Sequence, residues 1–246
     1  MGSIIAVLSG KGGTGKTSVC AGVASALAES GATVLSIDCD VGLRNLDISL
    51  GITDCGTLSF LDVLRGNYGL EQAPRHPGYP GLAFLTAPVN VPADKIDGEA
   101  FAQMLSQARK SFDYILLDAP AGLDAGFRLA ADSADRCILV TGAAPAAVRD
   151  AARVGEVLEI MGKKDVRLVV NRVDKSLFSS MKLTVDDIMD TAGLPLVGLV
   201  PEDPNVVLAA AFGMPLLQYK KRSAAAVCYR NIAKRIQGLP VPITLR

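Results

Sequence analysis

The chain has 246 residues, of which 50% are hydrophobic and 20% are charged, and its 25 basic side chains balance 25 acidic ones. This composition is typical of a folded globular protein and excludes a disordered chain. The neutral net charge gives no sign of a nucleic-acid-binding protein, although a local basic patch could still bind nucleic acid. The length suits one large α/β domain, and because no repeat or linker-like segment interrupts the chain, we expect a single domain over residues 1–246.

Short apolar runs bounded by Gly, Asp, Asn or Pro recur along the chain and alternate with stretches of helical periodicity. Strands are predicted at residues 4–9, 33–38, 82–87, 114–118, 136–141, 166–171 and 196–200. Helices are predicted at residues 16–30, 58–64, 98–111, 146–161, 205–212 and 223–237. Most strand runs are continuously apolar, which suits strands covered by helices on both faces. The pattern therefore predicts an α/β fold with a doubly wound, mostly parallel sheet flanked by helices.

One segment does not fit this alternation. Residues 74–80 contain three prolines, a glycine and the only histidine of the chain, His76. We predict a loop in which His76 is solvated and has no catalytic role.

Cysteine usage and the N-terminus indicate the compartment. The sequence has neither a signal-peptide pattern nor an apolar run near the ~20 residues that span a bilayer, so we expect a cytoplasmic protein. The cysteines are scattered and include no C-x-x-C pair, which argues against a zinc or redox motif. We expect buried, reduced thiols at all five positions: Cys20, Cys39, Cys55, Cys137 and Cys228.

The strongest local pattern joins the first predicted strand to the first predicted helix. The segment Gly10-Lys11-Gly12-Gly13-Thr14-Gly15-Lys16-Thr17 fits G-x-x-x-x-G-K-[ST]. Glycines let backbone N–H groups turn inward around an anion, and the following helix points its positive end at the same place. In this pattern Lys16 reaches the β- and γ-phosphates of a nucleotide and the Thr17 hydroxyl binds Mg²⁺. The alternative, a glycine turn that binds nothing, leaves the lysine and the amides without a use.

Carboxylates end two of the predicted strands. Asp118 ends an apolar strand, the layout of a Walker B carboxylate, although a strand-ending aspartate is also a common turn residue. Asp38 and Asp40 follow the second strand one residue apart, and side chains at i and i+2 of an extended segment face the same way. We expect both to address the metal and the attacking water. The alternative is an exposed turn, and only the nearby phosphate-loop pattern favours the functional interpretation.

With these residues placed, the chain resembles the MinD/ParA family of deviant Walker A ATPases, whose mark is the additional lysine at Lys11. Residues 38–47 are similar to switch I of the MinD members, and residues 118–122 are similar to their switch II. Residues 170–172 and 200–203 resemble the segments that hold adenine. The similarity runs in order along nearly the whole chain.

The resemblance implies an ATPase switch that binds ATP and Mg²⁺, forms an ATP-dependent homodimer and recruits regulatory partners of the MinC/MinE kind in division-site selection or spatial positioning. Lys11 would reach the partner subunit's ATP, and Asp40 would position the attacking water, so that Lys11, Lys16 and Asp40 form the catalytic set. The other implied roles are metal binding for Thr17, Asp38 and Asp118; nucleotide binding for residues 10–17, Ser18, Asn171, Pro201 and Asp203; and switching for Asn45 and Gly122.

Two departures from the family pattern leave questions open. The family often has a Pro-Glu pair where this chain reads Gly142-Ala143-Ala144, which puts the contacts of that glutamate in doubt. Residues 239–246 are short and broken by prolines, unlike the amphipathic helix with which MinD proteins bind membranes. Peripheral association with the inner face of the cell membrane therefore stays open.

The predicted helix at residues 223–237 has one apolar face and one basic face. We favour packing on the sheet with a solvated basic side. The upstream cluster of Lys220, Lys221 and Arg222 keeps an alternative in view, a ParA-like ATPase that loads on DNA non-specifically. A third reading, an iron–sulfur reductase like the nitrogenase iron protein, is disfavoured because that role needs paired cysteines across a dimer.

Overall fold

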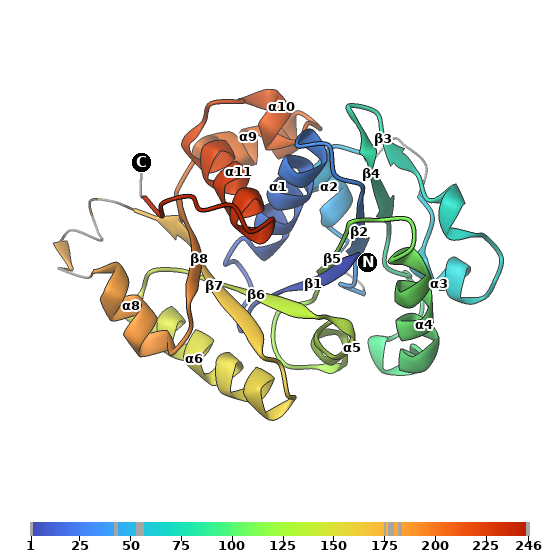
Figure 1. Cartoon of the computed structure of the whole chain (residues 1–246), viewed down its shortest axis with the longest axis horizontal. Helices are drawn as coiled ribbons and strands as arrows, with labels where there is room; N and C mark the ends of the chain where they lie inside the picture. Colours follow the sequence, from blue (N-terminus) through green and yellow to red (C-terminus); the bar gives the residue numbers. More distant parts are fainter. Residues whose placement is uncertain are drawn as a thin grey trace.

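The structure is a computed structural model, and it describes residues 2–41, 44–52, 57–174, 176, 180–181 and 184–244. Figure 1 shows a twisted central sheet with helices on both faces. Cys55 and two residues of the segment similar to switch I, Gly42 and Leu43, lie outside the described residues.

The described residues form an eight-stranded sheet in the order β3-β4-β2-β5-β1-β6-β7-β8. All neighbouring pairs are parallel except β3 with β4. This confirms the predicted doubly wound, mostly parallel sheet, and all seven predicted strands are present. The strands are β1 (Ser3–Leu8), β2 (Val34–Asp38), β3 (Arg75–His76), β4 (Tyr79–Leu85), β5 (Tyr114–Asp118), β6 (Arg136–Thr141), β7 (Asp165–Val173) and β8 (Leu196–Pro201).

Each face of the sheet is covered by its own helices and buries its own apolar cluster. One layer contains α1 (Lys16–Glu29), α2 (Leu46–Leu50), α9 (Pro204–Ala211), α10 (Leu216–Tyr219) and α11 (Ala224–Ile236). The other contains α3 (Phe60–Leu64), α4 (Gly98–Ala108), α5 (Ala125–Ser133), α6 (Pro145–Ile160) and α8 (Val185–Ala192), with the short 3₁₀ turns η1 (Leu70–Gln72) and η2 (Ala93–Lys95) in the connections.

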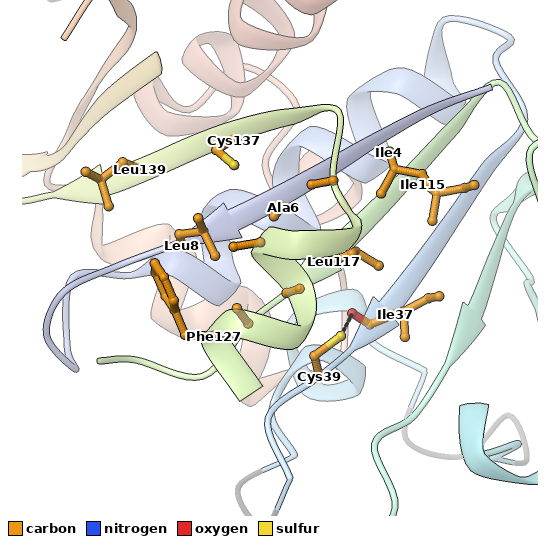
Figure 2. Close-up of a cluster of buried hydrophobic side chains, with 14 of the residues drawn as sticks. Ile4, Ala6, Leu8, Ile37, Cys39, Ile115, Leu117, Phe127, Cys137 and Leu139 are labelled. Carbon is orange, nitrogen blue, oxygen red and sulfur yellow. Dashed lines mark hydrogen bonds between the residues drawn. The ribbon is translucent and has the colours of Figure 1, made fainter. Parts of the chain in front are cut away.

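The two clusters explain why the strand runs are continuously apolar. Figure 2 shows Ile4, Ala6 and Leu8 of β1 on the face that carries Phe127 of α5. The intervening Ile5 and Val7 pack into the opposite cluster, against α1 and α11. Successive side chains of a strand point to opposite faces, so a strand buried on both sides needs apolar residues throughout.

Helix α11 packs on β8 of the sheet, as the favoured interpretation of its sequence predicted, and it also packs closely on α1. The Tyr229 ring is 1% exposed and lies so near Gly22 that a Cβ there would come within 2.1 Å of its Cδ2 atom. A Cβ at Gly198 of β8 would likewise lie 2.4 Å from Ile232 Cγ1. Glycine at these two positions therefore lets the C-terminal helix reach both the sheet and α1.

Two parts of the prediction for residues 74–80, the loop and the solvated His76, are wrong. β3 and the start of β4 form an antiparallel hairpin there, and His76 is 4% exposed rather than solvated. Its Nε2 atom lies 2.9 Å from the Leu50 carbonyl oxygen, and its Nδ1 atom accepts a hydrogen bond from the Gly78 N–H at 2.9 Å. These partners fit a neutral imidazole protonated on Nε2, and burial lowers the pKa of His76.

The predicted helices and the predicted buried thiols can also be compared with the structure. All six predicted helices are present, whereas α2, α5, α8 and α10 were not predicted. The prediction of buried thiols is confirmed for the four described cysteines, Cys20, Cys39, Cys137 and Cys228. Among the described residues, no helix combines the length and the apolarity that crossing a membrane requires.

Candidate functional site

The phosphate loop, residues 10–17, lies at the carboxyl edge of the sheet between β1 and α1. Gly13 and Gly15 both have φ of +80°, a left-handed conformation that glycine adopts without strain. α1 begins at Lys16 with no side-chain cap and no acidic residue in its first turn. Its first N–H groups therefore remain open to an anion, and the helix dipole favours one.

Lys16 is 6% exposed and forms an ion pair with Asp118 at the end of β5. Its ammonium group also lies 3.5 Å from the Thr17 hydroxyl oxygen. Burial by itself lowers the pKa of Lys16, but the charge and hydrogen bond of Asp118 outweigh it, so the pKa is raised. The lysine is thus charged and placed beside the open end of α1, with a carboxylate as its partner.

Two buried carboxylates face each other across neighbouring strands. Asp38 of β2 pairs in register with Asp118 of β5, and both are 1% exposed. Burial, followed by the charge of Asp118, raises the pKa of Asp38 to about 7, although backbone hydrogen bonds oppose the rise. Two carboxylates forced together in this way attract a cation.

The Asp38 carboxylate also holds the segment that follows β2. It accepts hydrogen bonds from the N–H groups of Asp40 at 2.9 Å and of Asn45 and Leu46 at 3.2 Å each. The sequence pattern predicted that Asp38 and Asp40 would face the site in the same manner, whereas the structure commits Asp38 largely to this backbone. Asp40 is half-buried, and burial raises its pKa against the opposing charge of Lys16.

The segment similar to switch II begins directly after Asp118. Gly122 has φ of +97°, and its N–H group donates to the Ser9 carbonyl oxygen at 3.0 Å. The residue just before the phosphate loop is therefore bonded to this segment. A change in the loop can reach residues 118–122 through one hydrogen bond.

Lys11, the additional lysine, forms an ion pair with Asp150 of α6. Its side chain is 65% exposed, and its hydrogen bond is the main cause that lowers the pKa of Asp150. A Cβ at the neighbouring Gly10 would lie 2.9 Å from Val154 Cγ2, so the loop passes close over α6. In the isolated chain, Lys11, which is expected to reach a second subunit, is held by α6 of the same chain.

The predicted base-contacting residues lie beyond the loop, around a cavity of about 160 Å³ whose lining includes Gly15, Ser18, Asn171 and Pro201. The Asn171 side-chain amide donates to the Thr14 carbonyl oxygen at 2.8 Å. Asp203 also borders the cavity, but its carboxylate accepts backbone hydrogen bonds at the starts of α9 and α11, from Asn205 at 2.9 Å and Ala225 at 3.1 Å.

Sequence reasoning gave no role to two residues that line the same cavity, Arg172 and Glu202. They form an ion pair with Nε and Oε2 2.8 Å apart, and Arg172 also donates to the Gly13 carbonyl oxygen at 3.1 Å. No spacing pattern marks them in advance. The signal was their position, directly beside Asn171 and Pro201 in the segments that resemble adenine-holding ones.

The residues present fit a polyphosphate with a divalent cation. The buried hydroxyls of Ser9 and Thr14 have no hydrogen-bond partner within the described part of the chain. The described residues contain no group of three His, Cys, Asp or Glu side chains that could cage a metal by themselves. Mg²⁺ instead commonly uses one or two carboxylates with phosphates and water, and Asp38, Asp118 and the Thr17 hydroxyl offer that kind of donor set.

Comparison with known proteins agrees with this geometry. The septum site-determining protein MinD of Synechocystis sp. is 38% identical over 244 residues, covering 98% of this chain and 92% of that protein. The structure of the MinC:MinD cell division protein complex of Aquifex aeolicus matches with a TM-score of 0.90 and 34% identity, covering 98% of each chain. MinD of Pyrococcus horikoshii complexed with Mg-ADP matches with a TM-score of 0.84 and 31% identity, covering 96% of each chain.

The family profile described as the CobQ/CobB/MinD/ParA nucleotide binding domain matches residues 5–216, a span that contains the phosphate loop, the facing carboxylates and Asn171. The chain therefore belongs to the CobQ/CobB/MinD/ParA nucleotide-binding family.

Proposed function

We propose that residues 1–246 act as one Mg²⁺-dependent ATPase domain of the MinD type, a switch in division-site selection. The observation that carries this proposal is the arrangement at the sheet edge, where Lys16 and the uncapped start of α1 lie beside the Asp38–Asp118 pair. The Mg-ADP in the related Pyrococcus horikoshii structure supports the same ligand for this chain.

The residues divide the chemistry between them. Lys16 exchanges its Asp118 partner for the β- and γ-phosphates, and the N–H groups of the phosphate loop bind the same oxygens. Thr17, Asp38 and Asp118 hold Mg²⁺, which supplies charge neutralisation on the phosphates when it is bound. Asp40, half-buried in the field of Lys16, orients the attacking water.

The switch operates through dimerisation. Lys11 leaves Asp150 and reaches the nucleotide of a second subunit, so that ATP joins two copies and hydrolysis releases them. Asn45 and Gly122 lie in the two segments that respond, since Asn45 is bonded to Asp38 and Gly122 to Ser9. The MinC:MinD complex of Aquifex aeolicus supports a MinC-like partner for this chain.

Light scattering after size exclusion tests the proposal. We expect monomer with ADP and dimer with ATP and Mg²⁺ in an Asp40→Ala variant, which binds ATP but hydrolyses it slowly. Adding Lys11→Ala to this variant removes the dimer without removing ATP binding. A chain that stays monomeric at saturating ATP in the Asp40→Ala background contradicts the dimer mechanism.

A second candidate function rests on the exposed basic cluster of Lys220, Lys221 and Arg222 between α10 and α11. A ParA-like protein would use such a cluster to bind DNA in its ATP form, with an affinity that falls steeply with salt. Replacing all three residues by alanine should then abolish a gel shift with ATP. A shift that is unchanged in the triple variant eliminates this candidate.

A further inference from the structure

The phosphate loop is tied to the end of β7 by two consecutive residues. Asn171 donates to the Thr14 carbonyl oxygen at 2.8 Å, and Arg172 donates to the Gly13 carbonyl oxygen at 3.1 Å. In a trans peptide the C=O and the following N–H point in opposite directions. Holding these two carbonyls on the side of β7 therefore directs the N–H groups of Thr14 and Gly15 toward the opposite side.

The backbone at Arg172 is specialised for this contact. Among the residues that the structure describes, Arg172 is the one non-glycine residue with a positive φ, at +57°. It lies where the pairing of β7 with β8 shifts register, between Val170 and Val173. A side chain with a Cβ seldom adopts this left-handed conformation, and such residues persist where the surrounding contacts determine them.

Glu202 fixes the plane of the guanidinium group. It accepts from Arg172 Nε at 2.8 Å and from Nη2 at 3.3 Å, which leaves Nη1 to donate to Gly13. The backbone N–H of Glu202 donates to the Val173 carbonyl oxygen at 3.1 Å, so the main chain that carries the carboxylate is anchored to β7. Arg172 is 57% exposed, and exposed ion pairs add little to the free energy of unfolding. The pair is therefore better suited to setting geometry than to stabilising the fold.

We propose that Arg172, oriented by Glu202, is a positioning residue that holds the phosphate loop in its anion-binding conformation. The inference rests on the proposed nucleotide site and adds a residue to it. Because Arg172 acts on the loop and not on the base, it contributes to the binding of any polyphosphate that uses the loop, with or without adenosine.

Competition against a fluorescent ATP analogue measures this contribution with two Mg²⁺-bound probes, ATP and inorganic tripolyphosphate, up to millimolar concentrations. We expect Arg172→Ala to weaken both by about the same factor, roughly fivefold to tenfold for one lost hydrogen bond. Arg172→Lys keeps the charge but not the planar fork, so both ligands stay weakened. Arg167→Ala is the matched control, since Arg167 lies on the same strand and forms an ion pair with Asp165 at 2.8 Å. This variant should bind both ligands like wild type.

The outcomes separate the alternatives. Weaker binding of ATP alone overturns the proposal, because Arg172 would then contact the base or ribose. Unchanged binding of both ligands also overturns it, because the Arg172–Glu202 pair would then be a surface ion pair with no effect on the loop. Arg172→Gly guards against misfolding, since glycine accepts the left-handed backbone; we expect its Tm to be at least that of Arg172→Ala while both ligands remain weakened. Wild type that binds neither probe refutes the proposed nucleotide site itself, which is a different result from selective loss in the variants.

Discussion

The phosphate loop and the segment that follows β2 approach the same site, yet they are held in different ways. The loop is fixed by a hydrogen bond from the buried, neutral Asn171 amide, by one from the exposed Arg172 guanidinium, and by its continuation into α1. The segment after β2 depends on one buried carboxylate, Asp38, which three backbone N–H groups share. The first arrangement gives a cradle that exists before the ligand binds. The second gives a segment whose order depends on a charge that is costly to bury.

The largest expected effect is at the cradle. Lys16→Ala removes the charge that meets the phosphates, and we expect ATP hydrolysis to fall by about 10²-fold to 10³-fold. Phosphate release under saturating ATP measures this loss, with Lys95→Ala as the control because the Lys95 side chain is 72% exposed and its ion-pair partner is the neighbouring Asp94. Hydrolysis within a few-fold of wild type in Lys16→Ala would show that the cradle is not the reaction site.

The next effect concerns the charge of Asp38. Its pKa of about 7 in the folded chain exceeds its ordinary value of 3.8, so the folded state holds the extra proton between these values. The contribution of Asp38 to the free energy of unfolding of the ligand-free protein is therefore greatest below about pH 4. This contribution is lost as pH rises to about 7, and its full size is up to about 4 kcal/mol.

Urea denaturation without nucleotide or Mg²⁺, at about pH 5 and about pH 8, checks this dependence. Asp38→Asn cannot ionise, so its free energy of unfolding should fall less between the two conditions than that of wild type. An equal fall in both proteins would show that Asp38 does not carry the costly charge. Mg²⁺ should also restore part of the stability of wild type at the higher pH but not that of the variant.

The smallest expected effect is at the contact between the loop and α6. Asp150→Ala frees Lys11, so we expect the ATP concentration at half-maximal dimerisation to fall by about twofold to fivefold, the size of effect usual for an exposed ion pair. Light scattering in the Asp40→Ala background measures it, with Asp132→Ala on α5 as a control. A rise in the required concentration would mean that Asp150 serves the dimer instead of restraining Lys11.

Local patterns in the sequence predicted what depends on local chemistry. Continuous apolar runs located all seven predicted strands, and the glycine and lysine spacing of residues 10–17 located the phosphate loop. One further local signal went unread: Thr184 and Asp187 bond reciprocally in a capping box at the start of α8, with the Thr184 N–H 2.7 Å from Asp187 Oδ2.

The features that sequence reasoning missed depend on contacts between distant segments. The prolines around His76 suggested a loop, but the Leu50 carbonyl, 26 residues away, gives the ring a buried partner. Sequence could place Asp38 at the sheet edge but could not show that its oxygens bond the segment after β2. The Lys11–Asp150 pair joins the loop to α6, and no residue spacing in the sequence predicts it because the two residues lie far apart along the chain.

The most direct test of the account is a crystal structure with a non-hydrolysable ATP analogue and Mg²⁺. We predict that the β-phosphate lies within the N–H groups of residues 10–17 and that Lys16 Nζ has moved from Asp118 to phosphate oxygens. An analogue bound elsewhere, with Lys16 still paired to Asp118 and the loop without phosphate, would contradict the account.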